Sequence, residues 1–334
     1  MESTLRTPQN VVPMDMTNAA LAGFEIAVIL PCYNEEAAIG AVVEGFRREL
    51  PQARIYVYDN NSKDKTSQVA AAAGAIVRSE TLQGKGNVVR RMFADVDADI
   101  YLMCDGDITY DAASAPALIA KLIQENLDMV VGCRVDSEAA AYRAGHRFGN
   151  ALFTGFVANL FGNRFTDILS GYRVFSRRYV KSFPALSNGF EIETELTVHA
   201  LQLRMPIGEL NTPYGARLEG STSKLSTYRD GFRIMLMITK LFKNERPLFF
   251  FSIIFALLAL LSLGLSLPVL LTYLETGLVP RLPTAVLAAS TMLLGFLALT
   301  CGLILDTVTH GRRELKRLAY LTVPSVGAML GKRT

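Results

Sequence analysis

Short apolar runs alternate with amphipathic segments along the first two thirds of the chain. Each run has the length of a buried strand, and the segment after it has apolar residues at helical spacing. The expected strands are 26–30, 54–58, 100–104 and 129–133, and the expected helices are 37–50, 65–73 and 115–126. This β-α-β order is typical of a mostly parallel sheet with helices on both faces. The pattern therefore predicts an α/β domain over residues 24–227.

Two much longer apolar stretches follow this domain. Residues 248–274 and 283–305 contain no charged side chain, and each stretch exceeds the ~18 to 20 residues that cross a bilayer. We therefore expect two transmembrane helices, at 248–274 and 283–306, joined by a short hairpin. The alternative is a pair of buried core helices, but such helices average about 11 or 12 residues and have a polar face.

Basic residues flank both outer ends of this pair: Lys240, Lys243 and Arg246 before it, and Arg312, Arg313, Lys316 and Arg317 after it. The positive-inside rule then predicts a protein of the inner membrane with the α/β domain and both chain ends in the cytoplasm. Residues 228–247 mix apolar and basic positions as a juxtamembrane amphipathic helix does. Residues 307–334 are expected to form a basic cytoplasmic tail. Residues 1–23 lack the apolar centre of a secretory signal and are expected to form a mobile tail.

Composition narrows the class of function. Of the 334 residues 50% are hydrophobic, as two spans require, and the net charge of +3 gives no indication of nucleic acid binding. Four cysteines are scattered without metal-ligand spacing, so neither disulfides nor zinc are expected. The chain has no Gly-x-Gly-x-x-Gly or phosphate-loop lysine motif, which argues against a dinucleotide or P-loop enzyme.

Two acids one residue apart, Asp105 and Asp107, follow the expected strand 100–104. Open α/β sheets bind ligands at the carboxyl edge of their strands, and carboxylate oxygens there suit Mg²⁺ or Mn²⁺ held partly by substrate phosphates. The alternative is a turn in which Gly106 supplies a positive φ and the acids act as caps. Polar clusters at 31–36, 59–62 and 132–134 are expected at the same edge, which favours the metal-diphosphate interpretation.

Five ordered motifs lie within residues 24–230: Val28-Ile-Leu-Pro-Cys-Tyr-Asn-Glu-Glu, Asp59-Asn-Asn-Ser-x-Asp-x-Thr, Gly84-Lys-Gly-Asn, Asp105-Gly-Asp and Asp167-Ile-Leu-Ser-Gly-Tyr-Arg. Together they resemble glycosyltransferase family 2, and most closely its polyprenyl-phosphate branch, which is similar to dolichol-phosphate mannose synthase. The resemblance implies a GT-A fold, which is a Rossmann-like, mostly parallel sheet. It also implies a nucleotide-sugar donor, Mg²⁺ or Mn²⁺, inversion at the anomeric carbon and a lipid phosphate acceptor.

The resemblance assigns donor binding to residues spread over these motifs and one later loop: Pro31, Tyr33, Asn34, Glu35, Asp59, Asn61, Lys85, Asp105, Gly106, Arg217 and Lys224. Several have structural alternatives. Asn34 could cap the following helix, Asp59 could close a turn with Asn60 and Asn61, and Lys85 could be an exposed loop lysine. The loop from Arg217 to Lys224 could simply be basic and near an anionic bilayer.

Metal binding is assigned to Asp105 and Asp107, with Asp107 also taken as catalytic. Some relatives carry a glutamine two residues after the second acid, but here Thr109 stands there, so the third metal ligand is left open. One of Glu191, Glu193 and Glu195 is expected to face the acceptor, although acids at a helix start are favourable without catalysis.

A phosphate acceptor is already ionised near neutral pH, so it needs cations more than a strong base. Arginine suits that task because its planar fork binds phosphate. The residues expected to bind the acceptor are Arg143, Arg147, Arg164, Ser170 and Gly171, and Arg147, Arg164 and Asp167 are also taken as catalytic. The apolar stretch 148–161 is expected on the membrane surface or else in a core helix. Asp167 would orient these arginines or form a structural salt bridge.

Together these features predict inverting transfer of a sugar from a nucleotide-diphosphate sugar to a polyprenyl phosphate at the cytoplasmic membrane face. UDP-hexose is the first expectation for the donor and GDP-mannose the second. A processive polysaccharide synthase is an alternative, but its usual Gln-x-x-Arg-Trp motif is excluded because the chain has no tryptophan. A non-enzymatic membrane scaffold would be expected to lack one of the paired acids. Gly295 and Gly302 would permit association of copies through the spans.

Overall fold

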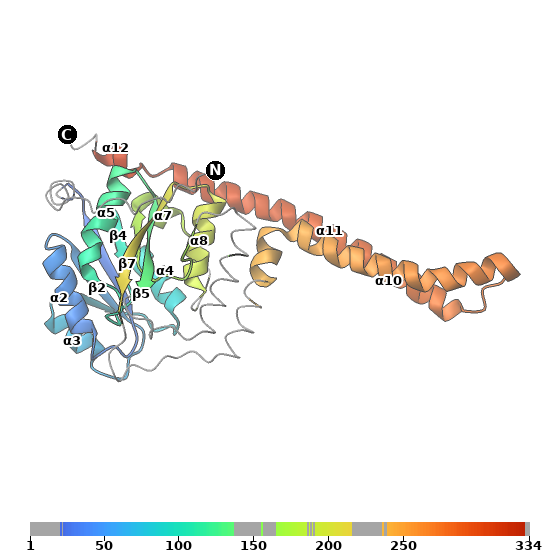
Figure 1. Cartoon of the computed structure of the whole chain (residues 1–334), viewed down its shortest axis with the longest axis horizontal. Coiled ribbons are helices and arrows are strands. Elements are labelled where there is room, and N and C mark those ends of the chain that lie inside the picture. The colour runs from blue at the N-terminus through green and yellow to red at the C-terminus, as the bar shows by residue number, and fades with distance from the viewer. Residues whose placement is uncertain are drawn as a thin grey trace, which may run out of the picture. The chain divides into compact units, whose positions relative to one another are not determined.

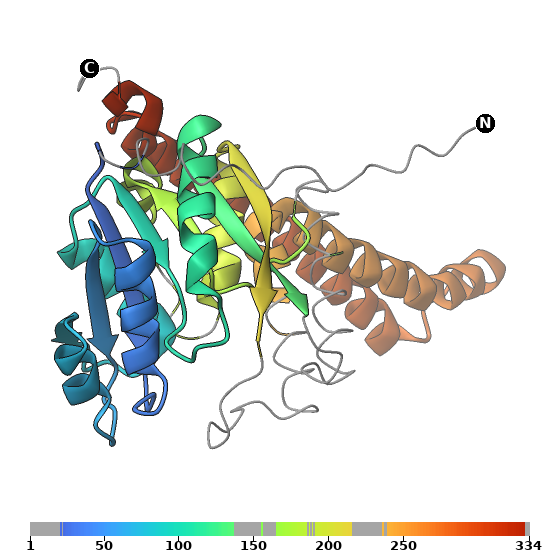
Figure 2. The ribbon, with the colours of Figure 1, turned by 60° about the vertical axis from the view of Figure 1, so that its left-hand side comes forward.

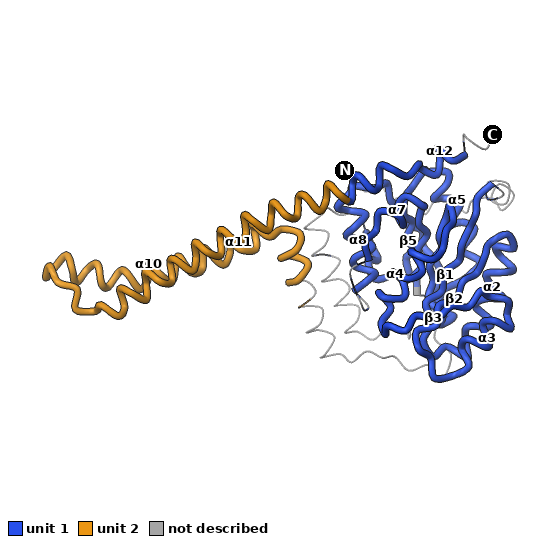
Figure 3. The backbone as a smooth tube through the Cα atoms, turned by 180° about the vertical axis from the view of Figure 1, so that it is seen from behind, with its two compact units in different colours: residues 1–227, 316–334 blue, residues 228–315 orange. Residues whose placement is uncertain are grey.

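The computed structural model describes residue 21, residues 23–136, residue 155, residues 165–185, residues 187, 189 and 191–215, residue 236 and residues 239–330. The chain divides into two compact units, which Figure 3 shows in different colours. Unit 1 comprises residues 1–227 and 316–334, and unit 2 comprises residues 228–315.

Unit 1 is built on a seven-stranded sheet with the order β3-β2-β1-β4-β6-β5-β7. The strands are β1 Ile26–Cys32, β2 Arg54–Asp59, β3 Ile76–Ser79, β4 Ile100–Met103, β5 Met129–Asp136, β6 Arg173–Ser176 and β7 Ile207–Tyr214. Every neighbouring pair is parallel except the two that β6 makes with β4 and β5. The predicted α/β class with a mostly parallel sheet is thereby confirmed.

Helices cover both faces of this sheet (Figures 1 and 2). They are α2 Ile39–Glu49, α3 Thr66–Ala72, α4 Lys85–Asp95, α5 Ala115–Gln124, α7 Arg177–Ser182 and α8 Ile192–Gln202, with the short 3₁₀ helix η1 at Ala112–Ser114. Helices α2 and α5 pack over one face, where Val43 and Leu118 join a core with Val28 and Leu102. Phe93 of α4 packs on Phe175 of β6 on the other face. Because both faces are covered, β1 and β4 are almost wholly buried and read as continuous apolar runs.

The end of the chain belongs to the core of unit 1. Val326 and Met329 of α12 (Val326–Leu330) are buried in the same apolar cluster as the sheet. Tyr320, near the end of α11 (Leu282–Leu321), donates a hydrogen bond of 2.8 Å to the buried Asp128. We predicted a basic tail over residues 307–334, but α11 continues through most of that range. The apolar positions of α12 are too few for the sequence pattern to distinguish from a tail.

Unit 2 contains α10 (Pro247–Thr276) and the larger part of α11. Both helices are long and apolar enough to cross a membrane, and most of their apolar side chains are exposed. They approach closely at Gly302, where an added Cβ would lie 2.8 Å from Phe251 Cβ. Nearer the hairpin, the Ser262 hydroxyl donates to the Ala288 carbonyl at 2.7 Å.

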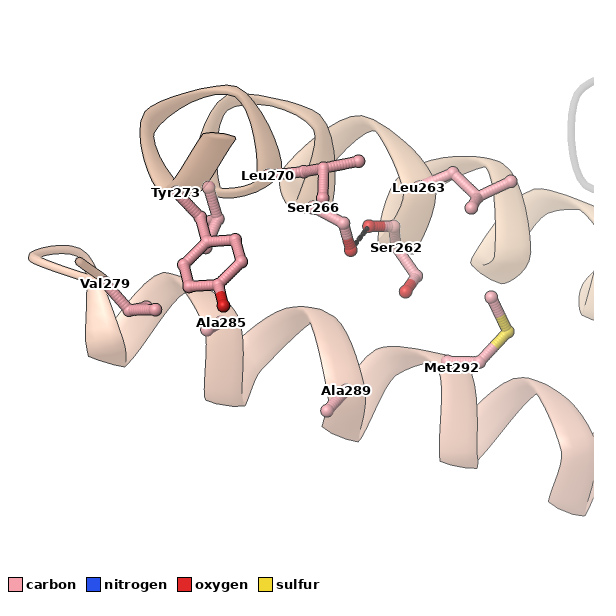
Figure 4. Close-up of a pocket in the computed structure, with 10 residues that line it drawn as sticks. Ser262, Leu263, Ser266, Leu270, Tyr273, Val279, Ala285, Ala289 and Met292 are labelled. Carbon is pink, nitrogen blue, oxygen red and sulfur yellow. Dashed lines mark hydrogen bonds between the residues drawn. The ribbon is translucent and has the colours of Figure 1, made fainter. Parts of the chain in front are cut away.

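A groove of about 550 Å³ lies between these two helices toward their hairpin (Figure 4). Its lining is apolar apart from the hydroxyl groups of Ser262, Ser266 and Tyr273. The Ser266 hydroxyl donates to the backbone of Ser262 at 2.8 Å, so it serves the helix. With no charged residue in its lining, the groove does not suit a nucleotide.

Candidate active site

The carboxyl ends of β1, β2 and β4 lie side by side, because these strands are adjacent and parallel. Asp59 ends β2, and Asp105 and Asp107 follow the end of β4. Lys85, the first residue of α4, reaches the same edge and contacts Asp105. The structure thus brings together polar residues from motifs that are far apart in the sequence.

Lys85 is the centre of this group. Its ammonium lies 2.5 Å from Asp105 Oδ1 and 2.5 Å from Glu193 Oε1, the latter from the first turn of α8. Burial alone would lower the pKa of Lys85, but the two carboxylates outweigh it and raise that pKa above its ordinary value. Lys85 is therefore a charged, buried lysine that bridges two acids, and the exposed-loop alternative is wrong.

Glu193 settles which of the three acids near α8 belongs to this group. Glu195 instead accepts a hydrogen bond of 2.8 Å from the backbone of Ser187. Glu191 is exposed at the N-cap of α8. The sequence could not distinguish them, because the choice depends on contact with Lys85, which lies 108 positions away.

Asp107 is buried and held by a neighbour. The Thr109 hydroxyl donates to Asp107 Oδ1 at 2.5 Å, and Thr109 is itself 2% exposed. Thr109, which stands where some relatives carry glutamine, therefore orients the second acid of the motif.

The turn alternative for this motif is wrong about Gly106. Positive φ in this turn belongs to Ile108, at 60°, and not to the glycine. Gly106 is needed because an added Cβ would lie 2.6 Å from Cys32 Sγ. Tight packing between the ends of β1 and β4, rather than backbone conformation, thus explains the glycine.

The loops after β1 and β2 hold each other. The backbone N–H of Asn34 donates to the Ser62 hydroxyl at 2.9 Å, and Asn34 Oδ1 accepts from the backbone N–H of Lys63 at 2.8 Å. Asn34 does not cap α2, because the N-cap of that helix is Ala38, without a side-chain hydrogen bond. That alternative is therefore wrong, and the role of Asn34 in donor binding stays a prediction.

Asp59 closes a turn, as one alternative held. Its carboxylate accepts from the Ser62 amide at 3.0 Å and from the Ser67 hydroxyl at 2.6 Å. These bonds fix the carboxylate at the edge of the sheet and are compatible with the predicted donor contact, which stays untested. Pro31, near the end of β1, and Tyr33 and Glu35, in the loop after it, are half-buried.

The buried Asn60 is a residue that the sequence analysis did not assign to the site. It donates to the carbonyls of Glu80 and Leu82, at 2.9 and 2.8 Å, and accepts from the Gly84 amide at 2.7 Å. Asn61 supports the same loop through a 2.8 Å bond to the Thr81 carbonyl. Asn60 therefore fixes the loop that delivers Lys85, and only its adjacency to Asp59 could have suggested this.

Asp167 forms a buried, bidentate salt bridge with Arg134 of β5. Nε and one terminal nitrogen of Arg134 each lie 2.8 Å from a carboxylate oxygen. Burial would raise the pKa of Asp167, but Arg134 outweighs it and lowers that pKa below its ordinary value. Glu209 of β7 accepts from the Thr166 amide at 2.7 Å and holds the start of the same loop. The structural salt bridge that we considered is therefore present.

Ser170 and Gly171 lie within this motif but face the protein interior. The Ser170 hydroxyl is fully buried and donates to the Gly132 carbonyl at 2.6 Å. The buried Arg173 donates to the carbonyls of Ile168 and Ser170, which braces the loop from inside. The predicted contact of Ser170 and Gly171 with an acceptor stays a prediction, and their described contacts are structural.

Other predicted site residues lie outside the described residues: Arg143, Arg147, Arg164, Arg217 and Lys224. The stretch 148–161, apart from residue 155, also lies outside the described residues. So does the first part of the expected juxtamembrane helix, residues 228–238, apart from residue 236. Their roles therefore stay predictions.

Whether the site suits a divalent cation depends on its donor atoms. Asp105 and Asp107, two positions apart in the segment after β4, offer hard carboxylate oxygens, the ligand type that Mg²⁺ and Mn²⁺ prefer. Across the part of the chain that the structure describes, no group of three or more His, Cys, Asp or Glu residues could hold a metal by itself. The donor set therefore fits a cation that takes its remaining ligands from a bound diphosphate.

Comparison with known proteins agrees with this arrangement. Residues 27–183 match the family described as "Glycosyl transferase family 2". Glycosyltransferase AglJ of Haloferax volcanii is 33% identical over 299 residues, which cover 89% of this chain and 98% of that relative. The dolichyl-phosphate hexose transferase of the same organism is 28% identical over 222 residues, which cover 66% of this chain and 96% of that relative.

Crystal structures of glucosyl-3-phosphoglycerate synthase from Mycobacterium tuberculosis have the same fold. The complex with phosphoglyceric acid matches with a TM-score of 0.59 at 25% identity, over 71% of this chain and 85% of that one. Another structure of that enzyme, in complex with Mn²⁺, UDP-glucose and phosphoglyceric acid, also gives a TM-score of 0.59. The likeness confirms the predicted GT-A fold.

Proposed function

Because the chain belongs to glycosyl transferase family 2, we propose that it transfers a single sugar, with inversion, from a nucleotide-diphosphate sugar to a polyprenyl phosphate. The observation that carries this proposal is the meeting of Asp105, Asp107 and Lys85 at the carboxyl edge of the sheet. Two carboxylates can hold a divalent cation together with a diphosphate, and a lysine beside them can offset the charge of that diphosphate.

The donor half of the proposal concerns these three residues. Asp105 and Asp107 would hold Mg²⁺ or Mn²⁺, which when bound neutralises charge on the departing diphosphate. Thr109 keeps Asp107 in place, and Asn60 keeps the loop before Lys85 in place. The mycobacterial glucosyl-3-phosphoglycerate synthase, which has the same fold, has been crystallised with Mn²⁺ and UDP-glucose. That complex supports UDP-hexose as the first donor to test. GDP-mannose is the second.

The acceptor half concerns the ionised phosphate. A phosphate monoester can attack the anomeric carbon without a strong general base, so the protein must mainly hold it near the donor. Arg143, Arg147 and Arg164 are the residues proposed to bind it. The name of the dolichyl-phosphate hexose transferase of Haloferax volcanii supports a lipid phosphate as acceptor.

Helices α10 and α11 support a membrane-bound acceptor. Both are long and apolar enough to span a bilayer, and basic residues precede the first span and follow the second. We propose that both spans anchor the catalytic domain at the cytoplasmic face, where the headgroup of a polyprenyl phosphate lies in water and its chain in hydrocarbon.

The test uses the full chain in detergent with a polyprenyl phosphate and Mn²⁺, and a panel of UDP-glucose, UDP-galactose and GDP-mannose. Mass spectrometry should show one added hexose on the lipid with one of these donors, and chelation by EDTA should abolish it. A ladder of added sugars would indicate a processive synthase instead. No product with any donor, while UDP still binds, would favour the scaffold.

Two variants separate the metal role from folding. Asp107→Asn should reduce transfer at least about a hundredfold, because a metal ligand and its charge are lost. Asp97→Asn is the matched control, since Asp97 pairs with Arg177 and is 62% exposed. Full activity of Asp107→Asn would reject the metal role.

A further inference from the structure

We propose that Lys85 is an internal counter-ion for Asp105, and that arrival of a metal-bound nucleotide displaces it while Glu193 retains it beside the site. The inference rests on the proposed function, because it takes Asp105 as a metal ligand. Lys85 then has a second task besides donor binding. It makes metal and nucleotide binding depend on each other.

Lys85 forms ion pairs with two carboxylates that shield its charge from water. The Lys85 ammonium lies 2.5 Å from Asp105 Oδ1 and 2.5 Å from Glu193 Oε1. The three side chains are only 11%, 30% and 8% exposed, in the order Lys85, Asp105 and Glu193. Water therefore screens these charges weakly, and a divalent cation on Asp105 would be strongly repelled by an ammonium on the same carboxylate.

Of the three side chains in this cluster, Lys85 is the one that can move most easily. Asp105 is confined, because a Cβ on Gly171 would lie 2.5 Å from its Oδ2. Glu193 is fixed through its backbone, since its carbonyl accepts from the Thr197 hydroxyl, which in turn accepts from the buried Arg173. The lysine side chain is a long, flexible stem that carries a point charge. Displacement of Lys85 from Asp105 is thus the smallest change that admits a cation.

After it leaves Asp105, the Lys85 ammonium would remain paired with Glu193. Glu193 keeps one of its two ion pairs, so Lys85 is not left uncompensated in a buried place. A nucleotide diphosphate then supplies a new partner for the ammonium and further oxygen ligands for the metal. Metal without nucleotide supplies neither. The site should therefore bind Mn²⁺ weakly alone and much more tightly with UDP, with equal and reciprocal coupling.

The experiment titrates Mn²⁺ into the full chain in detergent, with and without saturating UDP, and follows free Mn²⁺ by electron paramagnetic resonance. In the unaltered protein UDP should tighten Mn²⁺ binding at least about tenfold. In Lys85→Met, Mn²⁺ without UDP should bind about tenfold tighter or more, because the competing cation is gone. The gain caused by UDP should shrink by a similar factor.

Further variants guard the interpretation. Lys85→Gln retains hydrogen-bond donors toward both acids and should change coupling in the same direction if Lys85→Met does not fold. Glu193→Gln should weaken Mn²⁺ binding several-fold, since Lys85 then has Asp105 as its remaining carboxylate. Lys121→Met, which removes the Lys121–Glu125 pair at the end of α5, is the control and should leave both affinities unchanged.

Three results would overturn the exchange of Lys85 or a part of it. If Lys85→Met tightens Mn²⁺ binding equally with and without UDP, Lys85 is a stationary charge and the exchange is overturned, while the proposed function stands. If Glu193→Gln tightens Mn²⁺ binding, retention by Glu193 is overturned. If the unaltered protein binds UDP but no Mn²⁺ in its presence, the metal role in the proposed function falls, and the exchange with it.

Discussion

Gly171 lies directly against the carboxylate of Asp105, so close that an added Cβ would be 2.5 Å from Oδ2. The motif from Asp167 to Arg173 therefore supports an acid from a different motif, besides any contact it makes with an acceptor. This contact joins two motifs that are more than 60 positions apart in the sequence.

Replacing Gly171 with alanine should impair transfer more than stability. The new methyl group would push the Asp105 carboxylate out of place, and misplacement of a reacting group by about 1 Å can cost about a hundredfold in rate. We expect kcat to fall at least about tenfold and Mn²⁺ affinity to fall with it. Gly23→Ala is the control, because an added Cβ there meets nothing within 4 Å. Unaltered kinetics of Gly171→Ala would contradict the contact.

Gly106→Ala should destabilise the catalytic domain. The added Cβ would lie 2.6 Å from Cys32 Sγ, and overpacking of this kind typically costs about 1–3 kcal/mol. Cys32→Ala should remove that obstacle, so the double variant should recover part of the loss. Urea denaturation of the four proteins in the cycle measures this, and strictly additive free energies would mean that the clash is not with Cys32.

Arg134→Met should leave the Asp167 carboxylate buried and unpaired. Breaking a buried pair in this way typically costs about 3–5 kcal/mol. Adding Asp167→Asn should restore part of the stability, because no uncompensated charge remains. Arg177→Met, whose partner Asp97 is 62% exposed, should change the free energy of unfolding by less than about 1 kcal/mol. Equal losses in both single variants would argue against a special role for the buried pair.

His199 should make the domain sensitive to acid. Burial, and then the charge of Lys316, lower the pKa of His199 from 6.5 to about 3, so the folded state keeps it neutral. The unfolded chain binds the extra proton below its own pKa, so this stability is complete above pH 6.5 and declines as pH falls toward about 3. The loss should reach about 2 kcal/mol near pH 5.

The variant His199→Phe should remove that pH dependence. Phenylalanine would replace an imidazole that meets the rings of Tyr179 and Phe183 edge-on. The variant loses the bond between Ser182 and His199 Nε2, but Ser182 would still donate to the Tyr179 carbonyl. Urea denaturation at about pH 7 and about pH 5 should then show a smaller difference in unfolding free energy than in the unaltered protein. The same pH dependence in both proteins would assign acid sensitivity to other groups.

The sequence predicted those parts of the fold that depend on local patterns. Strand β1 and helix α2 were expected within two residues of their observed bounds, because a buried strand and an amphipathic helix each have a periodicity of their own. The antiparallel direction of β6 was not predicted. No pattern within Arg173–Ser176 records the direction in which that strand runs beside β4 and β5.

The site was predictable to the extent that it depends on topology. Parallel strands bring their carboxyl ends together, so the proximity of Asp59 and Asp105 to one edge follows from strand order. The pairing of Lys85 with Glu193 and of Asp167 with Arg134 does not follow from strand order, because each pair joins distant segments through side-chain packing. Gly106 shows the same limit, since its reason is the neighbouring Cys32.

Val326 and Met329 complete the core of the catalytic domain, yet the ribosome makes them after both apolar helices. The domain therefore cannot finish folding until the hairpin has been synthesised. Maturation of the enzyme is thus tied to the order of translation. A chain that stalled before α12 would carry an unfilled apolar surface for quality-control proteases to recognise.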